Sequence, residues 1–191
     1  MLLAVFYGLR RSEVLGIKWD AVDFVGNTIT IKHTVTKFNK EVHKADSTKN
    51  DSSYAVIPLP GLIKQKLMAW KDRQEKYRLM QPNDYFNEGY VCTLPDGRIL
   101  QPDFVSHHFK ILLAKHEMPI IRFHDLRHSS ANYLKYLGFD LKDIQTWLRH
   151  KDIQTTMNIY VNLDMEAKHG IANSLNERFK KFELQPKRQA R

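Results

Sequence analysis

Alternating apolar and polar positions come early in this chain, whereas apolar positions at helical spacing dominate its later part. Residues 27–36 (NTITIKHTVT) and 54–59 (YAVIPL) alternate and are rich in β-branched side chains, so each predicts a strand. The polar, lysine-rich stretch 37–53 between them predicts a long basic loop. Together these segments predict a small antiparallel sheet whose two strands are joined by that loop.

Helical periodicity predicts the remaining elements. Gly8 permits a break before a helix that starts near Leu9, and residues 62–79 place apolar side chains on one side of a second helix. Pro102 stands near the first turn of a third helix, which extends to residue 117. Four more helices are expected at 124–137, 141–149, 153–161 and 165–182.

Cap signals divide these later helices, with Gly138 predicted as a C-terminal cap and Asp152 and Asp164 as N-caps. The chain shows no internal repeat and no linker long enough to split it. We therefore predict one domain over residues 1–182 and a flexible basic tail over 183–191. Strands followed by helices favour the α+β class, mostly helical, with a small antiparallel β-sheet packed with a helical bundle.

Charge points to the kind of partner. The chain has 191 residues, and 30 Lys and Arg residues outnumber 21 Asp and Glu residues, which leaves a formal net charge of +9. This surplus favours a polyanion, nucleic acid first and an anionic membrane second. No apolar run approaches the roughly 18 residues of a spanning helix, and residues 1–8 do not form a signal peptide. The single Cys92 fits a reducing compartment. We expect a cytoplasmic protein that does not engage a membrane.

The densest cluster of reactive side chains is the pentapeptide HDLRH at 124–128. On a helix, His124, Arg127 and His128 are neighbours at i, i+3 and i+4. Two histidines at this spacing can share a zinc ion, but no Glu occupies the position of a metalloprotease base, and Arg127 would repel the ion. A guanidinium beside imidazoles instead suits an anion such as a phosphate. A solvated helix face without chemistry is the third interpretation.

Reactive residues before and after this cluster complete an ordered series, namely Arg10 and Glu13 in GLRRSE, Lys49 before the second strand, His150 in WLRH and Tyr160 in TTMNIY. In this order of Arg, Lys, His-x-x-Arg, His and Tyr, the sequence resembles the tyrosine recombinase (phage integrase) family over residues 1 to about 180. The resemblance covers the C-terminal catalytic domain of that family, so we expect a fragment that lacks the N-terminal DNA-binding domain.

The chemistry of a phosphodiester gives these residues their expected roles. Arg10, Arg127 and His150 are expected to stabilise the negative charge of the transition state without a metal ion. A tyrosine hydroxyl has an ordinary pKa of about 10, so the nucleophile Tyr160 needs nearby cations and a base, for which His124 is the candidate. No cofactor is expected.

The supporting assignments have rivals. Lys49 is expected to protonate the leaving 5′ oxygen as general acid, with Lys44 as its rival. Glu13 is expected to orient an arginine, and His128 to support the site by packing. Tyr133 and Tyr136 share a helix with leucines and are predicted to be core residues.

Three further points concern residues near these in the sequence. Arg11 is the rival of Arg10, but the helical phase turns it about 100° away. Arg149 stands where family members commonly have Gly before the histidine, at a cost of about 1 kcal/mol if the backbone there requires positive φ. Tyr54 likewise stands where the family frequently has a basic residue.

The resemblance implies site-specific recombination or integration of double-stranded DNA. Tyr160 would attack a phosphate and form a 3′-phosphotyrosyl bond with release of a 5′ hydroxyl, and a 5′ hydroxyl of another strand would reverse the attack. A homotetramer on paired DNA sites is implied, weakly associated or monomeric without DNA. A type IB topoisomerase, which rejoins the same strand, and a DNA-binding module with an idle site are the alternatives.

Overall fold

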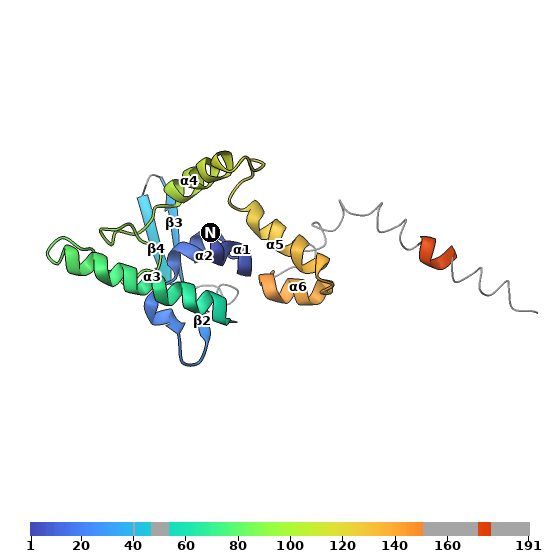
Figure 1. Cartoon of the computed structure of the whole chain (residues 1–191), viewed down its shortest axis with the longest axis horizontal. Coiled ribbons are helices and arrows are strands. Elements are labelled where there is room, and N and C mark those ends of the chain that lie inside the picture. Colours follow the sequence, from blue (N-terminus) through green and yellow to red (C-terminus); the bar gives the residue numbers. More distant parts are fainter. Residues whose placement is uncertain (40, 47–53, 151–171, 177–191) are drawn as a thin grey trace, which may run out of the picture. The chain divides into compact units, whose positions relative to one another are not determined.

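The computed structural model describes residues 1–39, 41–46, 54–150 and 172–176, and Figure 1 shows how the elements follow one another. The chain divides into two units, Met1–Lys151 and Asp152–Arg191, and the second is described only over residues 172–176, which are helical. The helices of the first unit are α1 (Leu2–Tyr7), α2 (Arg11–Gly16), α3 (Gly61–Met80), α4 (Pro102–Lys115), α5 (Asp125–Tyr136) and α6 (Leu141–Leu148), with a 3-10 turn η1 at Trp19–Ala21. None of the described helices is long and apolar enough to cross a membrane.

The strands form two small antiparallel sheets within the described residues. β1 (Val22–Asp23), β2 (Thr28–Ile31) and β5 (Ala55–Pro58) pair in the order β1-β2-β5. β3 (His33–Phe38) and β4 (Glu41–Asp46) form a separate hairpin. The fold is α+β and mostly helical, which confirms the predicted class.

Two of the strand predictions are wrong. The expected single strand at 27–36 is divided at Lys32 into β2 and β3, which join different sheets. Residues 37–38 and 41–46, expected in a loop, instead form the end of β3 and all of β4. A hairpin that is solvated over most of its surface carries polar residues, and Val42 alone is half-buried among residues 41–45, so β4 shows almost no hydrophobic alternation. Residues 47–53, with Lys49, lie outside the described residues.

The predicted helices agree better with the structure. Those at 62–79, 102–117, 124–137 and 141–149 correspond to α3, α4, α5 and α6 with ends shifted by a few residues. Gly138 follows α5 with φ 90°, as expected of a residue at a helix C-terminus. The helix at 153–161 and the caps at Asp152 and Asp164 fall outside the described residues, whereas residues 172–176 are helical within the predicted span 165–182.

The prediction that Tyr133 and Tyr136 belong to the core is wrong, because these side chains are 62% and 83% exposed. Helix α5 buries the face that carries Leu126, Arg127 and Ala131, and the two tyrosines lie on another side of it, stacked on each other. The inner face of α5 therefore carries a buried arginine and small or aliphatic side chains rather than the two tyrosines.

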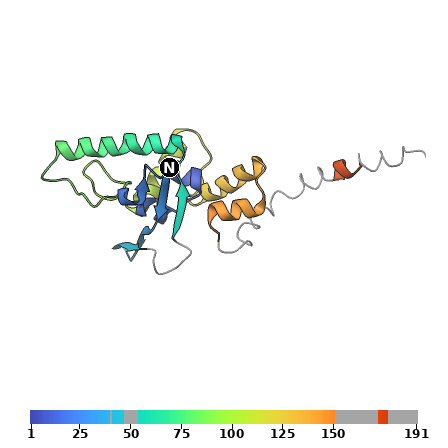
Figure 2. The ribbon, with the colours of Figure 1, turned by 90° about the horizontal axis from the view of Figure 1, so that it is seen from below.

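The main hydrophobic core lies between the three-stranded sheet and the helices. Its most deeply buried members include Ala4, Ile29, Ile31 and Ile63, from α1, β2 and α3. A smaller cluster of Leu15, Val35 and Tyr90 joins α2 to the hairpin. In Figure 2, α3 extends along one side of the strands. Helices α5 and α6 lie together toward the N-terminal end of α3, opposite to its C-terminal end.

Two glycines let backbone segments approach closely where the candidate site is built. Gly8 ends α1 with φ 61°, and a Cβ there would lie 2.3 Å from Cδ2 of Leu148. Gly16 ends α2, and a Cβ there would lie 2.1 Å from the carbonyl oxygen of His33. These contacts bring the C-terminal end of α6 to the junction of α1 and α2, and α2 to strand β3.

Candidate active site

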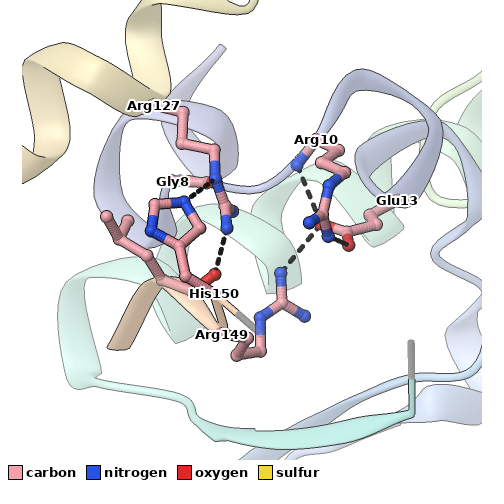
Figure 3. A network of polar contacts seen from close by, with 7 residues as sticks. Gly8, Arg10, Glu13, Arg127, Arg149 and His150 are labelled. Atoms are coloured by element: carbon pink, nitrogen blue, oxygen red, sulfur yellow. Dashed lines mark hydrogen bonds and ion pairs between the residues drawn. The ribbon is translucent and has the colours of Figure 1, made fainter. Parts of the chain in front are cut away.

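Arg127 is at the centre of a polar network that joins three helices. Its side chain projects inward from α5, and the residue is only 3% exposed. Nε–H donates to Nε2 of His150 at 3.0 Å, Nη1–H to the carbonyl oxygen of Gly8 at 2.5 Å, and Nη2–H to that of Leu148. Figure 3 shows the guanidinium enclosed by these acceptors. Arg127 therefore fixes the end of α1 and the end of α6 relative to α5.

Glu13 forms the second part of the network, one turn into α2. Its Oε1 accepts from Nη1 of Arg10 at 2.8 Å, while its Oε2 accepts the backbone N–H of Arg10 and Nη2–H of Arg149, both at 2.8 Å. The Glu13 side chain is 3% exposed and that of Arg149 is 12% exposed, whereas that of Arg10 is 43% exposed. The carboxylate thus links a buried cation to one that reaches the surface.

The charges in this network do not cancel. Burial alone would raise the pKa of Glu13, but Arg149 and Arg10 lower it below its ordinary value. Burial and repulsion by Arg10 lower the pKa of Arg127 to about 10, so this side chain is still protonated at neutral pH. Three guanidinium groups therefore face one carboxylate, and the network keeps an excess of positive charge.

The two histidines beside the network are neutral at pH 7. Burial, together with the charges of Arg127 and Arg10, lowers the pKa of His150 to about 4. Burial, His128 and Arg127 lower the pKa of His124 below its ordinary value. Because Nε2 of His150 accepts a hydrogen bond, the proton of its neutral ring is assigned to Nδ1. A neutral imidazole can accept a proton, as a general base must.

A pocket of about 500 Å³ opens beside this network. Its wall brings the predicted residues Arg10 and His124 together with further cationic side chains, and its lining includes Arg10, Arg11, Lys37, Ser106, Arg122 and His124. Lys37 also pairs with Asp103 at 2.7 Å, and Arg122 with Asp125 at 2.8 Å. The pocket has the size and charge to receive a phosphate group together with its flanking sugars.

The structure brings four of the six predicted catalytic residues into one region. Arg10 and His124 line the pocket, while Arg127 and His150, which are not among its lining residues, are hydrogen-bonded to each other. Of the two predicted supporting residues, Glu13 binds Arg10, and His128 is exposed with its ring 5.6 Å from that of His124. Lys49 and Tyr160 lie outside the described residues.

The rival assignments are also placed. Arg11 turns toward α4, where Nη1–H donates to the carbonyl oxygen of Pro102 and to the hydroxyl of Ser106. Lys44 pairs with Glu88, and its ammonium lies 5.7 Å from the ring centre of Tyr90. Both rivals therefore have partners outside the Arg127 network.

Sequence reasoning missed Lys37, Arg122 and the role of Arg149 in the network. Lys37 was assigned to a loop, and Arg122 carries no motif beyond its place two residues before His124. One feature of the sequence pointed to Arg149, namely a large side chain at a position where family members commonly have glycine. Its φ of 57° and ψ of 47° are left-handed, which costs about 1–2 kcal/mol for a residue with a Cβ.

Comparison with known proteins gives one consistent result. Residues 1–167 match the model of the phage integrase family. A tyrosine recombinase XerC-like protein of Caldanaerobacter subterraneus subsp. tengcongensis is 28% identical over 191 residues, covering 93% of this chain and 48% of that protein. The ICEBs1 integrase of Bacillus subtilis is 26% identical over 183 residues, covering 92% and 47%. The chain thus spans about half the length of these relatives.

Solved structures show the same fold. A segment of the Tn1549 transposon integrase, determined in complex with circular intermediate DNA, superposes with a TM-score of 0.69 at 18% identity, covering 91% of this chain and 57% of that one. The XerA recombinase superposes with a TM-score of 0.64 at 19% identity, covering 96% and 55%.

Proposed function

The chain belongs to the phage integrase family, and from that premise we propose that it breaks and rejoins double-stranded DNA at specific sites. The observation that carries this proposal is the excess of guanidinium charge around two neutral histidines, beside a cationic pocket. A phosphodiester supplies the negative charge that this network lacks, and that charge shifts onto the entering and leaving oxygens during strand transfer. The solved DNA complex of the Tn1549 integrase supports DNA as the substrate.

In the proposed reaction, the phenol oxygen of Tyr160 attacks the scissile phosphorus while the bond to the 5′ oxygen breaks. His124, neutral at pH 7, accepts the phenol proton, and Lys49 gives a proton to the leaving oxygen. Attack by a 5′ hydroxyl then reverses these transfers and releases Tyr160. The covalent bond conserves the energy of the phosphodiester, so no nucleotide is consumed.

The arginines and His150 stabilise the charge that develops. Arg10 is half-exposed at the pocket and contacts the phosphate. Arg127 adds its charge from behind and, through its hydrogen bond, sets the ring of His150. His150 donates from its protonated nitrogen, and the cations together take the place that a metal ion holds in other phosphoryl transfers.

The proposal extends to the catalytic assembly. We assign the catalytic domain to residues 1–182 and a basic tail to 183–191, and the family resemblance favours a homotetramer on paired sites. Lys37, Arg11 and Arg122 around the pocket are suited to contacts with the DNA backbone, which position the duplex without reading its sequence.

The test is covalent capture. The chain is incubated, in excess EDTA, with a pool of nicked duplexes of randomised sequence, and DNA that stays bound after denaturation is sequenced. We expect an adduct with the parent chain and none with Tyr160→Phe, which lacks the nucleophilic oxygen yet keeps its DNA affinity. The matched control Tyr136→Phe removes a hydroxyl from an 83% exposed ring on α5 and should form the adduct normally.

Each outcome separates the possible activities. Capture followed by strand exchange between two captured sites supports recombination. Capture with relaxation of supercoiled DNA and no exchange identifies a topoisomerase, and binding without capture identifies a DNA-binding module. An adduct with Tyr160→Phe would show that another residue is the nucleophile, and loss of the adduct in EDTA would show that a metal ion takes part.

A further inference from the structure

Arg149 joins the backbone that carries His150 to the carboxylate that holds Arg10. It ends α6 in the left-handed conformation, between Leu148, whose carbonyl oxygen accepts from Arg127, and His150, whose ring accepts from Arg127. Both neighbours in sequence are therefore fixed by Arg127, while the Arg149 side chain extends to another element.

That side chain reaches Glu13, which is 136 positions away in sequence. Nη2–H of Arg149 donates to Oε2 of Glu13 at 2.8 Å, and the same oxygen accepts the backbone N–H of Arg10. The other oxygen accepts Nη1–H of Arg10, so a single carboxylate serves both guanidinium groups. In Figure 3, Glu13 lies beside Arg10, and Arg149 approaches the pair from the opposite side.

Glu13 is the polar partner of Arg149 within the described part of the chain. Nε and Nη1 of Arg149 are buried and form no hydrogen bond with the described residues, so the ion pair with Glu13 compensates the burial of this charge. The ion pair therefore restrains the side chains of both Arg149 and Glu13. Without Arg149, Glu13 would pair with Arg10 alone and neutralise more of its charge.

We propose that Arg149 is a positioning residue for the reaction. By dividing the charge of Glu13, it leaves Arg10 with positive charge available to a phosphate and fixes the direction of the Arg10 side chain at the pocket. By adopting the left-handed turn after α6, it sets the point from which His150 extends. The effect on cleavage rests on the proposed function, whereas the effect on Arg10 does not.

The first test measures coupling between Arg149 and Arg10 without cleavage. The affinity for a short duplex is measured by fluorescence anisotropy for the parent chain, Arg149→Gly, Arg10→Ala and the double variant. We expect the fold loss of affinity caused by Arg10→Ala to be smaller in the Arg149→Gly background than in the parent chain, by a factor of about two or more. The reason is that Arg149→Gly already misplaces Arg10. Arg98→Gly, which removes an exposed arginine paired with Asp96, should combine additively with Arg10→Ala.

The second test measures the rate of adduct formation at saturating DNA. The substrate is the nicked duplex that the capture experiment identifies. We expect Arg149→Gly to fold, because glycine adopts the same backbone readily, and to lower this rate roughly 10- to 100-fold, as misplacement of reacting groups does. Arg149→Lys should recover part of the rate because its ammonium can still pair with Glu13. Arg98→Gly should match the parent chain.

The outcomes separate the two proposals. If Arg149→Gly cleaves like Arg98→Gly, or combines additively with Arg10→Ala, the positioning role is wrong. If Arg149→Gly does not fold, Arg149→Gln, which loses the charge that pairs with Glu13, decides by the same affinity cycle. If the parent chain forms no adduct at all, the proposed function fails, and the affinity cycle still decides whether Arg149 positions Arg10.

Discussion

At the scale of single residues, the candidate site combines charged arginines with neutral histidines, and the two conditions depend on each other. Burial and the charges of Arg127 and Arg10 keep a second proton off the His150 ring, while the hydrogen bond between Arg127 and His150 holds both side chains in place. A phosphate bound in the pocket would oppose the effect of the arginines and favour protonation of both histidines. Proton uptake is therefore expected to accompany DNA binding below neutral pH.

The lowered histidine pKa values predict how stability changes with pH. An unfolded histidine has a pKa of about 6.5, whereas that of His150 is about 4 in the fold, so between these values the unfolded chain binds more protons. The free energy of unfolding should therefore fall as the pH falls from about 6.5 toward 4. Denaturant unfolding at several pH values measures this slope.

A matched pair of variants tests the origin of that slope. His150→Gln should flatten it, because the titrating ring is gone, whereas His107→Gln removes an exposed imidazole of α4 and should leave most of the slope in place. An unchanged slope in His150→Gln would contradict the assignment.

Some of these residue positions could be predicted from the sequence, and others could not. Arg10 and Arg11 do turn in different directions, since Arg10 pairs with Glu13 and Arg11 contacts α4. Helical phase is not the reason, because Arg10 precedes α2 as its N-cap with an extended ψ of 150°, and both residues line the pocket. The bond between Arg149 and Glu13 was inaccessible, since it joins positions 136 apart and requires α6 to lie against α2. Local periodicity gives the direction of a side chain on its own helix but does not identify its partner.

At the scale of elements, two glycine contacts set how closely helices and strands approach. Gly16→Ala would place a Cβ 2.1 Å from the backbone oxygen of His33, which no rotamer change can relieve. We expect a loss of about 1–3 kcal/mol in the free energy of unfolding, typical of overpacking. Gly61→Ala, at the start of α3 with no atom within 4 Å of the added Cβ, should stay within about 0.5 kcal/mol of the parent chain.

Chemical denaturation compares the two variants, and adduct formation by Gly16→Ala gives a second measurement. Because α2 carries Glu13 and follows Arg10, a shift of α2 away from β3 should slow cleavage as well. Equal stability of both variants would mean that α2 and β3 tolerate a wider separation than the structure shows.

Helices were predicted from the sequence more accurately than strands, for a physical reason. A helix such as α3 buries Ile63, Leu67 and Gln74 on one side, at spacings of four and seven residues that repeat the helical period. Strands β2 and β3 continue the same alternation across Lys32, with Ile29, Ile31 and Val35 all buried, although they join different sheets. The change of partner between them depends on tertiary contacts, which alternation does not record.

At the scale of the whole molecule, the net charge of +9 is concentrated in part around the pocket, where Lys37 and Arg122 supplement Arg10 and Arg11. Affinity for duplex DNA should fall steeply with salt, with about −0.9 in the log–log slope for each phosphate neutralised. Lys37→Ala and Arg122→Ala should each flatten the slope by about 1. Lys76→Ala, an exposed lysine of α3 outside the pocket, should not, and equal slopes for all three would place the DNA elsewhere.

The last prediction concerns assembly. Ala167, Ile171, Leu175, Phe179 and Phe182 recur at steps of four and three, which predicts one apolar stripe on a helix. Within this span, residues 172–176 are helical and Leu175 is 50% exposed. The family resemblance favours a neighbouring protomer on DNA as the partner of this stripe, so deletion of residues 166–191 should weaken cooperative assembly on paired sites more than binding to one half-site. Gel-shift titrations with both substrates measure this difference.

The shorter deletion of residues 183–191 is the control for that experiment, because it removes the basic tail and keeps the stripe. Loss of the tail charge alone should weaken binding to both substrates by the same factor, since the tail acts through phosphates that each substrate carries. Loss of a contact between protomers acts only where two protomers meet. Intact assembly after the longer deletion, or unfolding of the remaining chain, would show that the stripe is not the contact between protomers.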